Sequence, residues 1–215
     1  GFEQRQQMLQ EQAVAVGDAL QDGILSHRSA IRRMADRLGA SADGEDRERV
    51  FDVDAAIYLR DFPDFAGVLW LDPDTRVVRQ KQRDDRPLDV VGRRLDFSLA
   101  REAVFERARE TGGTAESTPL RLLDGNTGEL LVAPGFDREG RLVGFAIAAM
   151  YQDVFYPSRL DKVGLPHPVR VFNGDQVVYQ RGQPGPRPPE VVRPDPQRPA
   201  LRVELWPDPA GEASR

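Results

Sequence analysis

The stretch Ser117–Asp153 constrains the fold most, because it consists of three short apolar runs separated by tight-turn sequences. The polar segments Asp124–Gly128 and Asp137–Gly140 divide the runs, and Pro134 ends the second. Short apolar runs punctuated by Gly, Asn, Asp and Pro predict an antiparallel meander. The last run, LVGFAIAAM, is apolar at every position, which is typical of a strand covered on both faces. The three predicted strands are Thr118–Leu123, Glu129–Ala133 and Leu142–Met150.

Composition removes several classes of function. The net charge of −5, without a basic stripe, argues against nucleic-acid binding. The absence of Cys excludes disulfides, thiolate catalysis and cysteine metal sites. No apolar run approaches the roughly 20 residues that span a bilayer. The chain begins without Met inside a helical pattern, so we expect it to be part of a longer protein.

Residues 4–38 carry apolar side chains at alternating steps of three and four, from Leu9 and Ala13 to Met34 and Leu38. This spacing predicts an amphipathic helix close to a heptad seam. At about 1.5 Å per residue the helix would be roughly 45–50 Å long, more than a compact domain of this size requires. It either packs across the back of its own domain or also dimerises along the seam. His27 lies in the stripe, and we expect it to be packed rather than to be a ligand.

Residues 45–153 are predicted to form an antiparallel α+β domain. The order is helix, hairpin, helix and then the three strands of the meander. A parallel doubly wound fold would need a helix between every pair of strands, so a PAS-like sheet fits better. The additional predicted elements are helices at 45–60 and Leu99–Glu110 and strands at Phe65–Leu71 and Arg76–Gln82.

Residues 154–215 differ in character. Val169–Phe172 and Gln176–Gln180 flank an Asn-Gly-Asp hairpin turn, and Leu201–Trp206 alternates apolar and polar side chains. Seven prolines in residues 183–199 predict an extended loop. The expected organisation is therefore a stalk helix at 1–44, a principal domain at 45–153 and a smaller unit at 154–215.

No catalytic constellation is visible. There is no G-x-S-x-G sequence, and His27 and His167 lie in a helix stripe and between prolines. Gly112-Gly113 follows a helix instead of opening one, and Asp124–Gly128 is better explained as a hairpin turn than as a calcium loop. We therefore expect no enzymatic activity, no metal and no cofactor.

What remains is a binding domain that encloses a small ligand between sheet and helix. Asp96 precedes a predicted helix and either caps it or accepts hydrogen bonds from a ligand. For the apolar candidates, core packing is the alternative role. Besides Asp96, the side chains expected to line the pocket are Trp70, Phe97, Thr118, Leu120, Val132, Phe145 and Ala148.

Four motifs together resemble the CHASE family of extracytoplasmic ligand-sensing domains, found in plant cytokinin receptors and in bacterial histidine kinases and diguanylate cyclases. They are Arg107–Gly112 (RARETG), Thr118–Leu123 (TPLRLL), Gly128–Pro134, and Gly144-Phe145 ahead of Tyr151-x-Asp153. The resemblance covers most of residues 45–210. It implies a stalk helix, a membrane-distal PAS-like ligand-binding domain and a smaller membrane-proximal PAS-like unit.

The resemblance also implies roles for individual residues. Asp96 would be the polar anchor for the ligand, and the backbone around Glu116 would face the ligand. The family's long insertion before the glycine-rich strand is reduced here to the turn Asp137–Gly140, so cytokinin itself is not implied.

The prediction is a periplasmic sensor domain of an inner-membrane receptor that binds a small ligand and signals through the stalk helix. A homodimer along that helix, membrane helices outside the chain and a cytoplasmic kinase or cyclase output accompany this prediction. Two alternatives stay open: a periplasmic interaction or dimerisation module without a small-molecule ligand, and a hydrolase whose site the sequence does not reveal.

Overall fold

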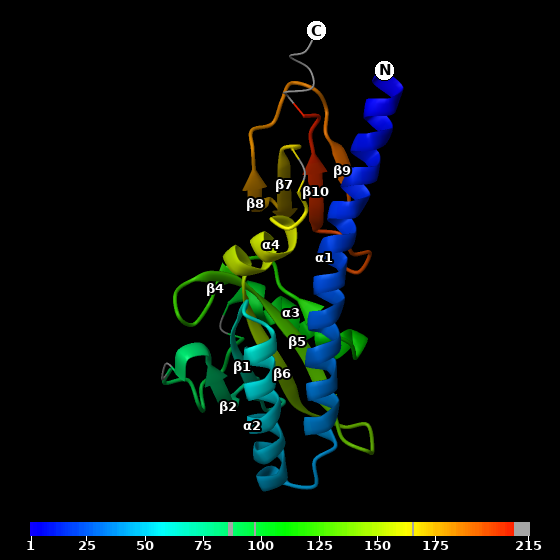
Figure 1. The fold of residues 1–215 in the computed structure, drawn as a ribbon. Helices are drawn as coiled ribbons and strands as arrows, with labels where there is room; N and C mark the ends of the chain where they lie inside the picture. The colour runs from blue at the N-terminus through cyan, green and yellow to red at the C-terminus, as the bar shows by residue number, and fades with distance from the viewer. Residues whose placement is uncertain (86–87, 97, 165, 209–215) are drawn as a thin grey trace. The chain divides into compact units, whose positions relative to one another are not determined.

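The computed structural model describes residues 1–208 except 86–87, 97 and 165 (Figure 1). The chain forms two compact units. The central unit is Ser26–Gln152, and the terminal unit combines Gly1–Leu25 with Asp153–Arg215. Helix α1 (Phe2–Gly39) confirms the predicted long N-terminal helix, but it is shared between the two units instead of forming a separate segment.

The central unit contains the predicted antiparallel sheet, which confirms the α+β assignment. Its strand order is β2-β1-β6-β5-β3, and β4 also pairs with β5. The long strands β5 and β6 form the middle, with Val132 opposite Ile147. The strands are β1 (Phe65–Leu71), β2 (Val77–Gln82), β3 (Ala115–Glu116), β4 (Leu120–Arg121), β5 (Thr127–Phe136) and β6 (Leu142–Tyr151).

Strand β5 continues through Pro134 to Phe136, so the prediction that this strand ends at Pro134 was wrong. The backbone N–H and carbonyl of Leu130 bond to Ser117, at the edge of β5 that faces β3. The backbone groups of a strand point alternately to its two edges, so the nitrogen of Pro134, four residues later, faces the same edge. Strand β3 pairs no further than Val132 on that edge. Pro134 therefore interrupts no ladder, which is how proline is tolerated in a strand.

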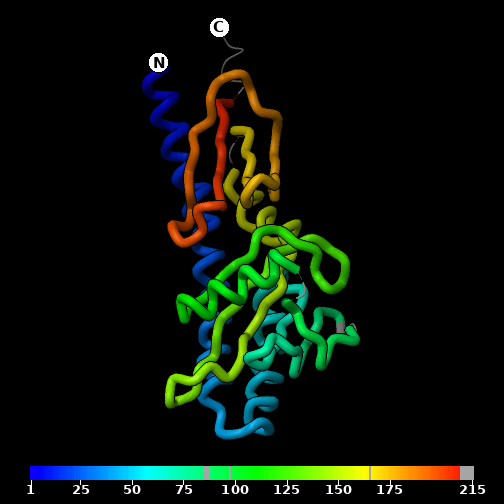
Figure 2. The backbone as a smooth tube through the Cα atoms, turned by 180° about the vertical axis from the view of Figure 1, so that it is seen from behind, coloured from blue at the N-terminus to red at the C-terminus, as the bar shows by residue number. Residues whose placement is uncertain are grey.

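Helices cover both faces of this sheet. Helix α2 (Gly44–Asp61) and the part of α1 in this unit pack on one face, which we call the α1/α2 face, over Val68, Trp70 and Ala146. Helix α3 (Leu99–Thr111) packs on the other, the α3 face, over Leu69, Val132 and Ile147. Figure 2, seen from behind, brings α3 to the front of the sheet.

Two buried polar pairs hold α1 to the central unit. Nε2 of His27 lies 2.9 Å from Oδ2 of Asp64, and both side chains are only 8% exposed. His27 also packs its ring at 4.9 Å from that of Phe65. Arg28, the next residue, donates to Oε1 of Glu116 on β3 at 2.7 and 2.9 Å. His27 is therefore a packed side chain with a polar partner.

The terminal unit contains a second antiparallel sheet, of order β8-β7-β10-β9. Strand β9 lies inside the segment that the prolines predicted to be an extended loop, which is a correction. Its three residues are free of proline, so their N–H groups can pair with β10. The elements are α4 (Gln152–Leu160), β7 (Val169–Asn173), β8 (Gln176–Arg181), β9 (Glu190–Val192) and β10 (Leu201–Leu205).

Glycines on α1 allow close packing in the terminal unit. A Cβ at Gly17 would lie 2.7 Å from Cγ1 of Val192, and one at Gly23 would lie 2.8 Å from Cε2 of Phe155. These glycines weaken the helix locally but let the strand and α4 approach it. Within the described part of the chain, no helix is both apolar and long enough to cross a bilayer.

Candidate functional site

A small cavity lies within the central unit, between the α3 face of the sheet and the turn that follows β4. Its floor is apolar and comes from β1, β5 and β6. Its volume is about 20 Å³, measured as the space open to the centre of a water molecule. That is enough for a water molecule but not for a larger ligand. The lining residues are Ala66, Leu69, Gln82, Leu95, Arg101, Leu122, Leu123, Asp124, Leu130, Ile147 and Ala149.

Arg101 supplies a buried positive charge to this cavity. The residue is only 3% exposed, and Nη2 donates to the carbonyl oxygen of Arg121 at 2.6 Å. Burial lowers the pKa of the Arg101 guanidinium from its ordinary value. A guanidinium offers donors in a planar fork that matches a carboxylate, so Arg101 is suited to bind one.

Asp124 supplies a carboxylate at the edge of the same cavity. Its Oδ2 accepts a hydrogen bond from the hydroxyl of Tyr151, and its Oδ1 accepts one from the N–H of Asn126 at 3.0 Å. A carboxylate accepts hydrogen bonds from an ammonium group, and such charge-assisted bonds are the stronger kind. The cavity thus combines an apolar floor with one group for an anion and one for a cation.

Local sequence explains why these two side chains lie where they do. Ser98 caps α3 by accepting from the N–H of Arg101, so the helix begins with Arg101 in its first turn. Arg101 shares its buried side with Val104 and Phe105. Asp124 starts a tight turn in which Gly125 has φ +89°, a conformation that glycine adopts without strain. The turn confirms that this sequence closes a hairpin.

The structure separates the predicted pocket residues by face. Val132 and Phe145 are fully buried on the α3 face, with Leu120 packed against the same cluster. Trp70 and Ala148 belong to the opposite, α1/α2 face. Neighbouring strand residues point to opposite sides, so Trp70 cannot share a pocket with Phe145 across the sheet. Leu69, one residue before Trp70, lines the cavity instead.

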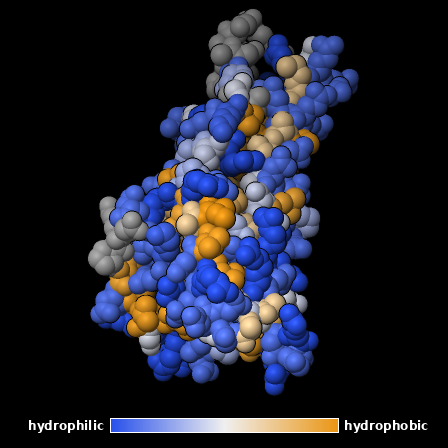
Figure 3. Space-filling model, turned by 60° about the horizontal axis from the view of Figure 1, so that its bottom comes forward, coloured by the Kyte–Doolittle hydropathy of each residue, from blue (hydrophilic) through white to orange (hydrophobic). Residues whose placement is uncertain are grey.

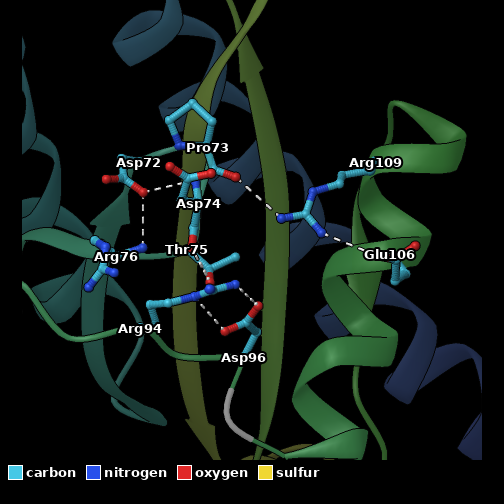
Figure 4. A network of polar contacts seen from close by, with 9 residues as sticks. All are labelled: Asp72, Pro73, Asp74, Thr75, Arg76, Arg94, Asp96, Glu106 and Arg109. Carbon is cyan, nitrogen blue, oxygen red and sulfur yellow. Dashed lines mark hydrogen bonds and ion pairs between the residues drawn. The ribbon is translucent and has the colours of Figure 1, made fainter.

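Asp96 is not among the residues that line this cavity, although its neighbour Leu95 is. Its carboxylate pairs with Arg94 at 2.7 and 3.1 Å, as Figure 4 shows. Burial is the largest single influence on the pKa of Asp96 and raises it. The hydrogen bonds from Arg94 and Thr75, the charge of Arg94 and a backbone hydrogen bond together outweigh burial, so the pKa lies below its ordinary value. The alternative role of Asp96 as the helix cap falls to Ser98.

The same surface network joins the β1–β2 turn to α3. Arg109 donates to the carbonyl oxygen of Pro73 at 3.2 Å and lies 3.4 Å from Glu106 (Figure 4). Thr75 is completely buried and has φ +65°, an unusual conformation for a β-branched residue. Asp96 thus belongs to a structural network around this turn.

The remaining predicted residues are dispersed. Thr118 is exposed, and the side chain of Glu116 pairs with Arg28 on α1. Phe97 lies outside the described residues. Sequence reasoning missed Arg101 and Asp124; the one signal for Arg101 was its position on the apolar side of a predicted helix. Among the described residues, no three His, Cys, Asp or Glu side chains gather as metal ligands.

Comparison with known proteins identifies the fold. No protein-family model and no curated protein sequence matches the chain. The ligand-binding domain of the Pseudomonas aeruginosa amino acid chemoreceptor PctB, in complex with L-Arg, is 11% identical over 97% of both chains, with a TM-score of 0.65. The domain of the Campylobacter jejuni chemoreceptor Tlp3, in complex with L-valine, is 10% identical, with a TM-score of 0.66 over 83% of this chain and 72% of that one.

A third solved structure is a larger protein, and this chain matches only part of it. An extracellular ligand-binding receptor from Desulfohalobium retbaense is 16% identical, with a TM-score of 0.57 over 82% of this chain. This chain spans only 30% of that receptor. At these identities the similarity shows the fold alone. The chain has the fold of the PAS-like ligand-binding domains of bacterial chemoreceptors, with a long N-terminal helix followed by antiparallel sheets.

Proposed function

We propose that this chain is the extracytoplasmic sensor domain of a bacterial transmembrane receptor and that it binds a small zwitterion, such as an amino acid. The observation that carries the proposal is that Arg101 and Asp124 both line one cavity with an apolar floor. The fold supports it, because solved domains of this fold are ligand-binding domains of chemoreceptors, several in complex with amino acids.

The two charged groups match the two ends of a zwitterion. Arg101 would bind the α-carboxylate and Asp124 the α-ammonium group, while Leu69 and Ile147 would contact the side chain. Charge-assisted hydrogen bonds to buried groups are worth about 1.5–3 kcal/mol each. A ligand that lacks either charge would leave buried Arg101 or partly buried Asp124 without its ligand partner, and specificity follows from that penalty.

Binding must widen the cavity, since about 20 Å³ is too small for an amino acid. The ligand would compete with the carbonyl oxygen of Arg121 for Arg101 and with the hydroxyl of Tyr151 for Asp124. Releasing these contacts would let the turn after β4 move away from the sheet. A ligand that binds the widened form better shifts the equilibrium toward it, which is the physical basis of a sensor.

A continuous set of contacts leads from the cavity to α1. The hydroxyl of Tyr151 binds Asp124, and the N–H of Tyr151 donates to the carbonyl oxygen of Asp64 at 2.7 Å. The carboxylate of Asp64 lies 2.9 Å from His27 on α1. We propose that displacement of Asp124 changes how α1 packs against the central unit, through Tyr151 and Asp64. Spatial continuity supports this route, and a coupling measurement must test it.

The cellular setting is part of the proposal. A periplasmic location, anchoring by membrane helices outside this chain, signalling through α1 and pairing of two copies along it all follow from the receptor role. A histidine kinase or diguanylate cyclase output, and membership of the CHASE family, rest on the motif resemblance alone. The binding proposal does not depend on them.

The decisive experiment is calorimetric titration of the purified chain with L-amino acids. For each amino acid, two analogues are titrated as well: the amine that lacks its carboxylate and the carboxylic acid that lacks its ammonium group. A hit should lose about tenfold or more affinity when either charge is absent. Arg101→Met should cause a similar loss. The matched control is Arg109→Met, on the same helix but outside the cavity lining. Equal affinities for the two variants would contradict the assignment of Arg101.

Ligand binding to the Tyr151→Phe variant tests the proposed coupling between the cavity and α1. This variant keeps the ring but removes the hydroxyl bond to Asp124. Ligand-induced changes in the amide or side-chain resonances of His27 should shrink in Tyr151→Phe while the amino acid still binds. Unchanged resonance shifts would refute the proposed route to α1.

The small cavity favours a second candidate, a periplasmic interaction module with no small-molecule ligand. Leu99, at the start of α3, is 85% exposed, and Val91 is 59% exposed. Figure 3 shows hydrophobic side chains in several separate groups on a largely hydrophilic face. Grouped apolar surface can mark a protein contact. Failure of every amino acid to bind, together with loss of self-association in Leu99→Asp, would favour this function.

A further inference from the structure

The terminal unit contains a second and much larger cavity, at the first turns of α1. Its volume is about 250 Å³, against about 20 Å³ for the cavity in the central unit. Ligand sites commonly measure some 300–1,000 Å³, so this cavity, at about 250 Å³, is slightly smaller than that range. The segments before β7 and after β10 provide the other walls.

The walls combine an apolar body with positive charge. The apolar lining is Phe2, Met8, Leu9, Pro166 and Pro207. Arg5 and Arg187 also line the cavity, and the guanidinium of Arg187 lies 5.8 Å from the ring centre of Phe2. Among the described residues, Arg5 has no side-chain hydrogen bond or ion pair.

The lining residues carry fewer negative than positive charges. Of the lining residues that the structure describes, Asp208 is the one carboxylate, against the two guanidinium groups of Arg5 and Arg187. Glu190, outside the lining, already accepts a hydrogen bond from Nε2 of Gln6 at 2.6 Å. The chain as a whole carries a net charge of −5, so this local excess of positive charge is not a general property of the surface.

Within the part of the chain that the structure describes, Oε1 of Gln12 and Nδ1 of His167, both in the lining, are buried without a hydrogen-bond partner. Buried polar groups are nearly always paired, and an exception calls for a partner. The amide of Gln12 can present its oxygen or, after a flip, its nitrogen. A ligand with a polar head in this cavity would be placed to satisfy one or both of these groups.

We propose that this cavity is a second ligand site, which binds a small organic carboxylate with an apolar body. The guanidinium groups of Arg5 and Arg187 hold the carboxylate, since this cation binds carboxylates through several donors at once. Phe2, Met8 and Leu9 contact the apolar part. This site takes a monoanion, whereas the central cavity is suited to a zwitterion, and neither proposal depends on the other.

The test uses four probes that separate charge from hydrophobicity: sodium hexanoate, hexylamine, hexanol and sodium acetate. Titrations are followed by the methyl resonance of Met8 and by calorimetry. Hexanoate should bind saturably, with a Kd of about 1 mM or tighter, and at least about tenfold better than hexanol or acetate. Hexylamine should not bind. No saturable response to hexanoate, or equal responses to hexanoate and hexylamine, would overturn the proposal.

Variants then locate the site. Arg5→Gln combined with Arg187→Gln should weaken hexanoate by about tenfold or more. Met8→Trp should abolish binding by filling the cavity, and the fold should tolerate it because Met8 is 55% exposed. Arg138→Gln, on an exposed turn of the central unit, is the charge-matched control. Hexanoate affinity that is unchanged in the double variant and in Met8→Trp would refute the location.

Discussion

The ion pair between Arg28 and Glu116 allows a quantitative test of how α1 is held to the central unit. Their side chains are only 13% and 9% exposed, and both Nε and Nη2 of Arg28 donate to Oε1 of Glu116. Arg28→Met keeps most of the side-chain volume but leaves a buried carboxylate without this cation. Breaking a buried pair in this way typically costs about 3–5 kcal/mol.

A matched control lies one turn further along the same helix. Arg32 is 3.7 Å from Asp36, and their side chains are 52% and 62% exposed. Exposed pairs contribute about 0–1 kcal/mol, so Arg32→Met should be close to neutral. We expect Arg28→Met to lower the free energy of unfolding of the central unit by about 3 kcal/mol. That corresponds to a fall in Tm of roughly 6–12 °C for a unit of this size.

The assay must report on the central unit alone. The chain has two tryptophans, Trp70 in the central unit and Trp206 in the terminal unit, so a Trp206→Phe background restricts fluorescence to Trp70. Urea unfolding is then measured for Arg28→Met, for Glu116→Gln and for both together. The double variant should lose about 1–2 kcal/mol less than the sum of the singles, because no buried charge is left without its partner. A cost for Arg28→Met no larger than for Arg32→Met would refute the reasoning.

Two further perturbations test packing and protonation. Gly144→Ala should destabilise the central unit by about 2 kcal/mol or more, because the new Cβ would lie 2.3 Å from the carbonyl oxygen of Leu71; thermal unfolding checks this against Gly185→Ala, where nothing lies within 4 Å. Burial and the hydrogen bond to Asp161 raise the pKa of Tyr179 to about 12. Stability from neutral Tyr179 should therefore be complete below about pH 10 and lost as the pH rises through about 12. Asp161→Asn should lower the pKa of Tyr179 toward 10 in an ultraviolet titration of tyrosinate, and an unchanged pKa would contradict the role of that bond.

Local patterns were sufficient to predict most elements of secondary structure. The predicted strand Phe65–Leu71 coincides with β1, and the predicted helix Leu99–Glu110 differs from α3 by one residue at its end. Apolar spacing and turn residues act over a few positions, so one sequence reveals them. Strand β4 covers only Leu120–Arg121 of the predicted strand Thr118–Leu123, and β3 was not predicted. Two further exceptions were Pro134, which lies where the neighbouring strand has ended, and β9, which lies between prolines. Both depend on pairing with distant segments.

The candidate site could not be located in the same way. Strand β1 is buried at all seven positions, so its sequence has no polar alternation to distinguish Leu69 from Trp70. Strand geometry makes the two residues face opposite sides of the sheet. Which of those sides borders the cavity is decided only by the packing of α3 on one face and of α1 with α2 on the other. Likewise, Arg101 on α3 and Asp124 after β4 meet at one cavity only once both segments pack on the same sheet.

The sequence by itself determined that this chain is an α+β protein with a long first helix and antiparallel sheets, because those features follow from short-range periodicity and turn chemistry. Tertiary structure alone decided how α1 is divided between two compact units and which side of each fully buried strand borders a cavity. It also brought Arg5 and Arg187 to the walls of a second cavity. Such placements depend on which distant surfaces pack together, and an apolar run has the same sequence pattern whichever partner covers it.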